Sequence, residues 1–551
     1  MELSSVLLFV MILLPLVFAA LVAMRPREHA AGIATVGMLA AGLVATLGLF
    51  QFDWSRTAEF QGAGSISWMP SLGMELSVGV DSVAMLLVAL TALLGPICVI
   101  ASYTAIREKT QTFYAMLLIL QAAMFGVFCA RDLVFFYICF EFTLIPMYVM
   151  ISLFGSTNRK AAATKFFLYT FTGSVIALAG FVYVAWYHAN VFTEGEWTLA
   201  SEPLRQAAAS MPADQQVWVM LAMLAGFAIK VPLFPVHTWL PLAHTEAPTA
   251  GSVILAGVLL KLGTYGIYRF VLPFAPAAVV EYAPIIAIVS IIGIVYAGLI
   301  CWVQTDVKKL VAYSSVSHLG FCVLGLVAIN NAGLTGAILY MINHGLSTGA
   351  LFLLIGMVYE RYHTRSMREL GGLAYKMPIW GCFMVYFAMA SVGLPGVNGF
   401  ISEFLCLMGT FQADASWAMV SANGDGATPG ATFGTLGPWF ALVAGTGMII
   451  AAIYILFMVG KVCIGPLDDD HGPKLPTDLS AREIGVLMPL AILCLVFGLY
   501  PKPLLVAVSD PVNQTVSQVV EGYRAVTPMN PVIDAPPVPA MTLRTEEGAA
   551  Q

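Results

Sequence analysis

Long apolar stretches separated by short polar segments run through almost the whole chain. A helix needs about 20 apolar residues to cross a bilayer, and the pattern predicts about fourteen such helices. They are expected near residues 4–24, 30–50, 77–103, 113–130, 132–153, 166–188, 217–241, 249–272, 283–303, 308–330, 333–358, 378–411, 436–464 and 484–506. The alternating pattern of a membrane β-barrel is missing, so the fold class predicted is an all-α polytopic membrane protein.

Composition supports this fold class. Hydrophobic residues make up 59% of the 551 residues and charged residues only 10%, which excludes a soluble domain of this size. The first apolar stretch lacks a basic leader, with Glu2 as its only charge, so we expect a retained helix and not a cleaved signal. The basic residues are distributed among the loops and form no basic patch. The net charge of −6 therefore gives no indication of nucleic-acid binding.

The loops between the predicted helices differ in charge and length. Most lysines and arginines fall in the loops of one side, for example Arg25, Arg107, Lys160, Lys308 and Arg361. The positive-inside rule places that side in the cytoplasm and both termini outside. The longest loops, near 51–76, 189–216 and 412–435, are then outside, as is a proline-rich tail after Tyr523 that we expect to be disordered.

Six titratable residues fall near the middle of predicted helices. A charge at bilayer depth costs about 2.5–3.5 kcal/mol even on the mildest scale, so such residues are rare and usually functional. These six combine acidic and basic groups, which predicts a path for protons, with static ion pairs between helices as the alternative. The six are Glu141, Lys230, Lys261, His318, His344 and Glu403.

Two of the predicted helices are interrupted beside a charge. Lys230 is followed by Pro232 and Pro235, and Glu403 follows the segment Gly393–Gly399. A break frees backbone groups that lipid cannot satisfy, so we expect a hydrated pocket at each break, with a plain proline kink as the alternative. The matching breaks predict two inverted repeats of five helices, helices 4–8 and 9–13. The chain is thus divided into 1–112 (helices 1–3), 113–272 (first repeat), 273–464 (second repeat) and 465–551 (helix 14 and tail).

The residue types fit proton transfer. Lysine can release its proton at depth whereas arginine cannot. Hydroxyl and amide groups neighbour His318 and His344, which favours a relay over two hydrogen-bonded core histidines. His237 and His244, beside the first break, are expected either to admit protons or to cap the loop. The histidines and cysteines lack ligand spacing, so no metal or cofactor site is predicted in this chain.

Three motifs resemble the signature of the antiporter-like subunits of respiratory complex I and the related Mrp-type antiporters. They are Lys230-Val231-Pro232-Leu233-Phe234-Pro235-Val236-His237-Thr238-Trp239, Tyr313-Ser314-Ser315-Val316-Ser317-His318 and Asn343-His344-Gly345-Leu346. The similarity covers helices 3 to 13. Most of that superfamily has lysine at the position of Glu403, and the chain resembles the complex I subunit type with glutamate there.

The resemblance implies that Glu141 pairs with Lys230, that Lys261 is the central relay, that His318 and His344 continue the axis, and that Glu403 ends it. It also implies a subunit of a proton-translocating NADH–quinone oxidoreductase in a bacterial inner membrane. NADH, FMN, iron–sulfur clusters and quinone are then expected in partner subunits, which include two related antiporter-like chains. An Mrp-type sodium/proton antiporter, a membrane-bound hydrogenase subunit and a purely structural anchor are the alternatives.

Overall fold

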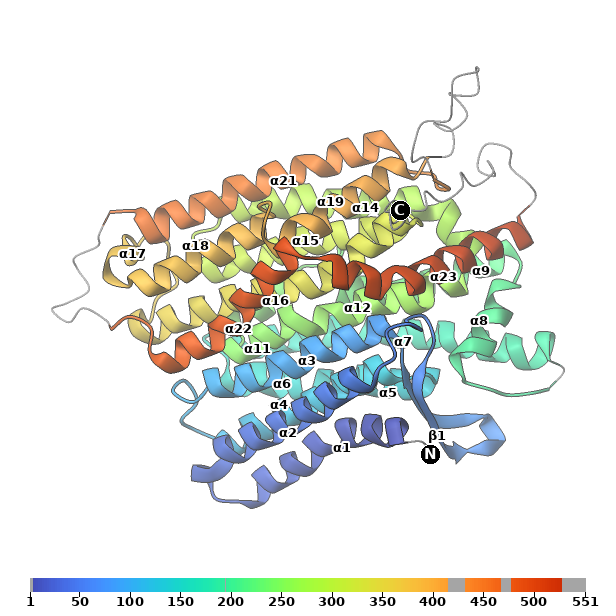
Figure 1. Ribbon diagram of the computed structural model, residues 1–551, viewed down its shortest axis with the longest axis horizontal. Helices are drawn as coiled ribbons and strands as arrows, with labels where there is room; N and C mark the ends of the chain where they lie inside the picture. Colours follow the sequence, from blue (N-terminus) through green and yellow to red (C-terminus); the bar gives the residue numbers. More distant parts are fainter. Residues whose placement is uncertain (1–2, 194, 415–431, 467–476, 528–551) are drawn as a thin grey trace, which may run out of the picture.

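The computed structural model describes residues 3–193, 195–414, 432–466 and 477–527, and these form a bundle of helices aligned along one axis (Figure 1). Among these residues, 12 helices are long and apolar enough to cross a membrane. The predicted all-α membrane class is confirmed. The spans are formed by α1 (Leu3–Met24), α2 (Ala30–Gln51), α3 (Ser82–Ala101), α4 (Thr110–Cys129), α5 (Leu133–Phe142) with α6 (Leu144–Phe154), α7 (Arg159–Tyr187), α11 (Thr249–Ile254) to α13 (Leu272–Phe274), α14 (Pro276–Val303), α15 (Val307–Val327), α16 (Asn331–Tyr362), α21 (Pro438–Val459) and α22 (Ala481–Leu499).

The other two predicted spans are broken helices. The stretch 217–241 overlaps α9 (Ala213–Lys230) and α10 (Leu240–Glu246), and the stretch 378–411 overlaps α18 (Pro378–Val392) and α19 (Asn398–Gln412). Both interruptions lie where the prolines and glycines predict them. The total of fourteen crossings and the relation between the two halves as inverted repeats stay predictions.

The two ends of the bundle differ. The basic end, at the left of Figure 1, carries Arg107, Lys308, Arg361 and Arg365, together with the short helix α17 (Leu373–Lys376). The hairpin end, at the right, carries α8 (Ser201–Ala209) and an antiparallel hairpin of β1 (Gln61–Met69) and β2 (Met74–Val80). The sequence predicts an irregular loop and a helix from residue 77 at this place, and that prediction is wrong. Strand pairing between residues such as Ile66 and Leu76 satisfies the backbone there instead.

An amphipathic helix that the sequence analysis does not predict follows the last predicted span. The span expected to end at 506 ends at Leu499, and α23 (Lys502–Val526) continues toward the hairpin end. Its low hydropathy and Pro511 hide it from a search for spans, but one face is buried against the bundle through Leu504, Val508, Val512, Val519 and Tyr523. The predicted disordered tail lies, from residue 528 on, outside the described residues.

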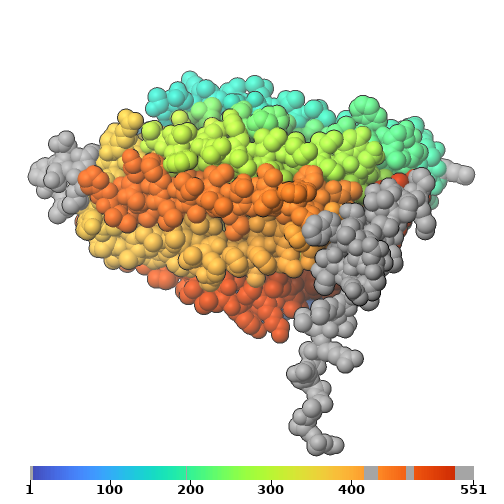
Figure 2. Space-filling view, turned by 90° about the horizontal axis from the view of Figure 1, so that it is seen from above, coloured from blue at the N-terminus to red at the C-terminus, as the bar shows by residue number. Residues whose placement is uncertain are grey.

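The centre of the bundle is formed by α11–α13, α15 and α16. Nearly all residues of these spans are buried, whereas α14 and α21 keep an exposed face. Figure 2 shows α14 and α21 side by side on the surface that covers this centre. Three of the six predicted residues, Lys261, His318 and His344, lie on the central helices.

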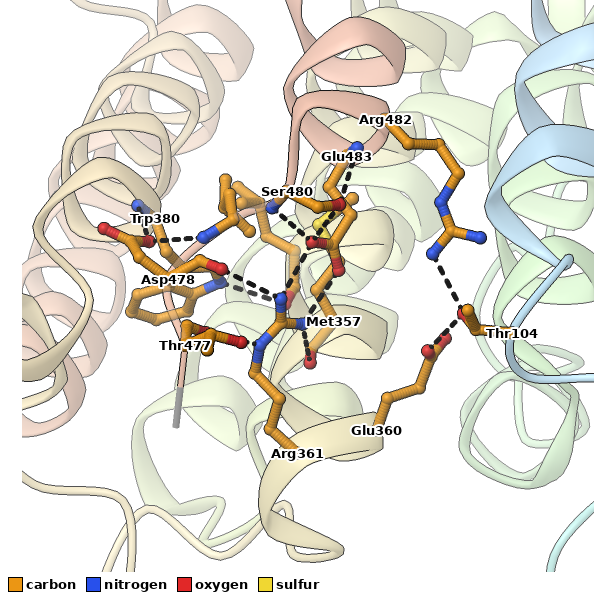
Figure 3. Close-up of polar contacts among 12 residues, drawn as sticks. Thr104, Met357, Glu360, Arg361, Trp380, Thr477, Asp478, Ser480, Arg482 and Glu483 are labelled. Atoms are coloured by element: carbon orange, nitrogen blue, oxygen red, sulfur yellow. Dashed lines mark hydrogen bonds and ion pairs between the residues drawn. The ribbon is translucent and has the colours of Figure 1, made fainter. Parts of the chain in front are cut away.

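A polar clamp holds the basic ends of α16 and α22 together (Figure 3). The Arg361 guanidinium donates to both carboxylate oxygens of Glu483 at 2.8 Å and also to the backbone carbonyls of Met357, Thr477 and Asp478. Glu483 in turn completes a capping box with Ser480 at the start of α22. The clamp therefore fixes α22 against α16, the helix that carries His344.

We expect Arg361→Ala to destabilise the protein by about 2–4 kcal/mol, because it leaves the Glu483 carboxylate largely buried without its partner. The measurement is the thermal unfolding midpoint of the purified protein in detergent. Arg56→Ala is the matched control, because Arg56 pairs with Asp53 on the exposed surface and such pairs contribute little. Equal midpoints for the two variants would contradict the clamp.

Candidate functional site

The central lysine and one of the histidines are in direct contact. Lys261 lies in α12 (Leu260–Gly266), is fully buried, and its Nζ is 2.7 Å from Nδ1 of His344 in α16. The lysine also donates to the backbone carbonyl of Ala256. Ala256 belongs to a π-helical turn, Leu255–Leu259, that directly precedes α12. Such turns shift the helical hydrogen-bond ladder and are frequent at functional sites.

A second group of contacts joins His318 to Glu403 through a tyrosine. The hydroxyl of Tyr340 is 2.6 Å from Nδ1 of His318 and donates to Oε1 of Glu403 at 2.5 Å. The same histidine nitrogen is 3.3 Å from that carboxylate oxygen. The two groups meet at the histidines, whose ring centroids lie 5.8 Å apart. The structure therefore places Lys261, His344, His318, Tyr340 and Glu403 in one buried row, which we call the central row.

Sequence reasoning missed Tyr340. It lies four residues before His344 on α16, and this spacing puts both side chains on one face of a helix. The four-residue spacing from His344 is therefore the feature of the sequence that could have identified Tyr340. Tyr454 and Ser391 were missed as well: their hydroxyl oxygens are each 3.4 Å from Nε2 of His318.

The second break supports the far end of the central row. Gly393, at φ 79°, ends α18, and a Cβ there would lie 2.6 Å from Oε2 of Glu403. Amide groups satisfy the interrupted backbone: Asn343 donates to the Asn398 carbonyl at 2.8 Å, and Asn398 donates to the Asn343 carbonyl at 3.1 Å. The break thus makes room for the carboxylate and is locked to α16. The hydrated pockets expected at the two breaks stay predictions.

Lys230 occupies the end of α9 at the first break. Its Nζ donates to the Thr143 hydroxyl at 3.0 Å and lies 3.8 Å from the centre of the Phe140 ring. The freed carbonyl of Ile229 accepts from the indole of Trp239 at 2.9 Å. The break is therefore satisfied by protein groups, as lipid requires.

The pairing of Glu141 with Lys230 that the resemblance implies stays a prediction: the two charges interact electrostatically but are not in direct contact. Within the described residues no ion pair joins them, and Oε1 of Glu141 is buried without a hydrogen-bond partner. Successive residues of a helix point about 100° apart, so Phe140 faces Lys230 while Glu141 lies on the half-exposed side of α5. Glu141 and Lys230 nevertheless lie on two neighbouring helices, since Phe140 of α5 contacts Lys230 of α9.

The two histidines beside the first break are both buried. His244 in α10 stacks on Phe352 with ring centroids 4.7 Å apart, and neither of its ring nitrogens has a hydrogen-bond partner. His237 packs against Phe234 and Tyr296. The predicted alternative, that they cap the loop, also stays a prediction, and the His237 ring has a hydrogen bond with the Pro235 backbone. Their predicted role in admitting protons stays a prediction.

Comparison with known proteins identifies the family of the chain. Residues 130–425, which contain all six predicted residues, match the family model described as NADH:quinone oxidoreductase/Mrp antiporter, TM. The chain belongs to this family. NADH-quinone oxidoreductase subunit M of Rhodobacter capsulatus is 37% identical over 94% of this chain and 97% of the relative. NADH-ubiquinone oxidoreductase chain 4 of Arabidopsis thaliana is 36% identical over 93% of this chain and 96% of the relative.

Solved structures of the family share the fold. A chain of respiratory complex I from Thermus thermophilus with bound NADH matches with a TM-score of 0.77 and 27% identity, over 95% of this chain and all of that chain. A chain of the Mrp complex from Dietzia sp. DQ12-45-1b matches with a TM-score of 0.76 at 19% identity, over 96% of this chain and all of that chain. The resemblance to antiporter-like subunits is confirmed, and relatives at this level of identity are of the subunit M or chain 4 type.

We expect Tyr340→Phe to reduce NADH-driven proton uptake at least about fivefold, which corresponds to about 1 kcal/mol on a barrier. The change keeps the ring and removes the hydroxyl that joins His318 to Glu403. Proton uptake by inverted membrane vesicles is the measurement. Tyr386→Phe is the control, because that hydroxyl only donates to the Ala491 carbonyl. The same uptake in both variants would show that the hydroxyl of Tyr340 is not needed.

We expect Gly393→Ala to impair proton uptake more than Gly396→Ala. Both glycines have positive φ, so each substitution carries the same kind of backbone strain, of order 1–3 kcal/mol. Only at Gly393 does the added methyl group meet the Glu403 carboxylate, because nothing lies within 4 Å of a Cβ at Gly396. Initial rates of uptake in vesicles, at equal amounts of assembled protein, separate the two effects. Equal losses would mean that strain alone is responsible.

Proposed function

We propose that this chain is an antiporter-like membrane subunit of a proton-pumping NADH–quinone oxidoreductase, and that protons pass along the central row. The observation that carries the proposal is the row of side chains from Lys261 through His344 and His318 to Tyr340 and Glu403, in which only the step between the two histidine rings lacks a hydrogen bond. Relatives named NADH-quinone oxidoreductase subunit M support the assignment to that enzyme.

The geometry supports a stepwise transfer. The Lys261 ammonium donates toward Nδ1 of His344, and the histidine accepts with that nitrogen. At 5.8 Å between ring centroids, transfer from His344 to His318 requires a bridging water or a ring rotation. From His318 the Tyr340 hydroxyl accepts a proton on one side while it donates to Glu403 on the other. Lys261 is left neutral by this transfer and returns to its starting state when it takes up the next proton, and Glu403 returns to its own when its proton leaves.

Glu141 and Lys230 are proposed to drive this transfer. Lys230 is buried at the first break, and Glu141 lies partly exposed where another subunit can act on it. A change in charge or position at Glu141 alters the field at Lys230, and through it the affinity of Lys261 for its proton. Gly263, two residues after Lys261, packs on the backbone of Phe227 and Val231 at the end of α9. That packing is the mechanical link between the two groups.

The placement in the cell follows from the charges. The basic end is proposed to face the cytoplasm of a bacterium and the hairpin end to face outward, with both termini outside. The redox steps, which use NADH, FMN, iron–sulfur clusters and quinone, are assigned to partner subunits, among them two related antiporter-like chains. The described part of this chain brings no three histidine, cysteine or acidic side chains together as metal ligands.

A subunit of an Mrp-type sodium/proton antiporter is the second candidate, favoured by the shared fold with the Mrp complex. A membrane-bound hydrogenase subunit is a further one. Sodium uptake by vesicles that contain the assembled protein, in the absence of NADH, would favour the antiporter. NADH-driven proton uptake that is independent of sodium favours the oxidoreductase.

We expect Lys261→Met to abolish NADH-driven proton uptake and to slow quinone reduction, because it removes the first proton carrier of the central row while keeping most of the side-chain volume. Inverted membrane vesicles report both rates, and a native gel reports assembly. Lys461→Met, at an exposed lysine near the end of α21, is the control. Intact coupled turnover in Lys261→Met would mean that the buried charges are static ion pairs.

A further inference from the structure

A buried ion pair lies on the helix of Lys261, toward the hairpin end. Arg269 donates to Oδ2 of Asp81 at 2.5 Å, and only 2% of the aspartate side chain is exposed. Oδ1 of Asp81 accepts from the backbone N–H of Ala84 at 2.9 Å and caps α3. Both carboxylate oxygens are therefore engaged.

Aromatic rings enclose the guanidinium of Arg269. The ring centres of Phe60, Tyr265 and Tyr268 lie 5.1, 5.3 and 5.5 Å from its central carbon. Phe60 comes from the segment before β1, which is tied to α23 by a hydrogen bond from Thr57 to Asp510. The rings and the ion pair together form a closed layer, which we call the Arg269 layer.

A cavity of about 360 Å³ opens directly outside this layer at the hairpin end, and it has room for a cluster of water molecules. Its lining is mixed and includes the polar and charged residues Glu59, Arg131, Glu202, Arg205 and Gln518. Arg269 and Asp81 line it too, and 19% of the Arg269 side chain is exposed. The Arg269 layer is thus the inner wall of this outward-facing cavity.

The proton-carrying lysine lies a short distance behind the layer. Lys261 precedes Arg269 by eight residues on one continuous helical segment, or about 12 Å at 1.5 Å per residue. A file of a few water molecules would join the lysine to the cavity. Protons that took this way would bypass His344, His318 and Glu403.

We propose that the Arg269 layer is a proton seal, which closes the hairpin end of the Lys261 compartment and forces protons along the central row. The inference rests on the proposed function of Lys261 as a proton carrier. Residues Asp81, Arg269, Tyr265 and Phe60 form the seal, and it acts on protons and hydronium ions.

The chemistry of the layer explains why it does not conduct. A guanidinium does not release its proton in proteins, so Arg269 cannot pass one on. The Tyr265 hydroxyl accepts from Nε of Arg269 at 3.2 Å and has the backbone carbonyl of Phe128 as its own acceptor at 3.4 Å. The rings occupy the space that water needs, and a fixed arginine is a barrier to protons in other membrane pores.

Passive proton flux tests the seal without turnover. The whole complex is reconstituted in liposomes, a potassium diffusion potential is applied without NADH, and proton influx is recorded. We expect Arg269→Gln combined with Asp81→Asn to raise the flux at least about tenfold, since this removes both charges together and leaves neither unpaired. Adding Lys261→Met to this variant is expected to return the flux to the wild-type level, because the leak runs through Lys261.

Glu202→Gln combined with Arg205→Gln is the matched control, since it removes an ion pair of 2.6 Å at the mouth of the same cavity. We expect the passive proton influx of this control variant to equal that of the wild type. An assembled Arg269→Gln/Asp81→Asn complex that is as tight as the wild type overturns the seal, as does a leak that Lys261→Met does not suppress.

If the double variant does not assemble, Phe60→Ala decides, because it opens the ring cage from a surface segment and keeps the ion pair. A leak that Lys261→Met suppresses supports the seal, and a tight Phe60→Ala complex overturns it. These outcomes are separate from failure of the proposed function, which is read from driven proton uptake in Lys261→Met alone.

Discussion

Charged groups and interrupted backbone at bilayer depth are costly unless they find partners inside the protein, and much of the arrangement of this chain follows from that constraint. Ile229 at the first break receives the Trp239 indole, and the second break is held by reciprocal amide bonds between Asn343 and Asn398. Lys261 is met by a histidine and by a backbone carbonyl next to a π-helical turn. The groups that satisfy these needs are also the groups that compose the site.

The same constraint links structure to mechanism. A relay side chain needs a hydrogen-bond partner on each side, so that it can accept a proton from one and donate a proton to the other. Buried networks of this kind keep the side chain in place. Tyr340 is the clearest case, since its hydroxyl lies between His318 and Glu403. The contacts are made across α12, α15, α16 and α19, so a movement of any of these helices changes the relay.

Insulation is as important as conduction for a pump. At the basic end the Arg361–Glu483 clamp holds α16 and α22 in place, and at the hairpin end the Arg269 layer, which we propose as a proton seal, forms one wall of a cavity. Arginine, which keeps its charge, forms the ion pairs at both ends. Lysine and histidine, which can bind and release a proton, occupy the centre. The division of residue types matches the division of tasks.

The sequence by itself determined the membrane class, most of the helix positions, both breaks and the six titratable residues, because hydropathy, prolines and charges act locally and are read directly along the chain. Only the tertiary structure decided which of these residues meet. Tyr340 joined the row, the Lys230 ammonium met the Thr143 hydroxyl, and Arg269 met Asp81, 188 positions away in sequence. The hairpin and α23 were also missed, since strand pairing and an amphipathic face are stabilised by neighbours and not by hydropathy. Contacts of this kind depend on the rotation of each helix about its axis, which packing sets and composition does not.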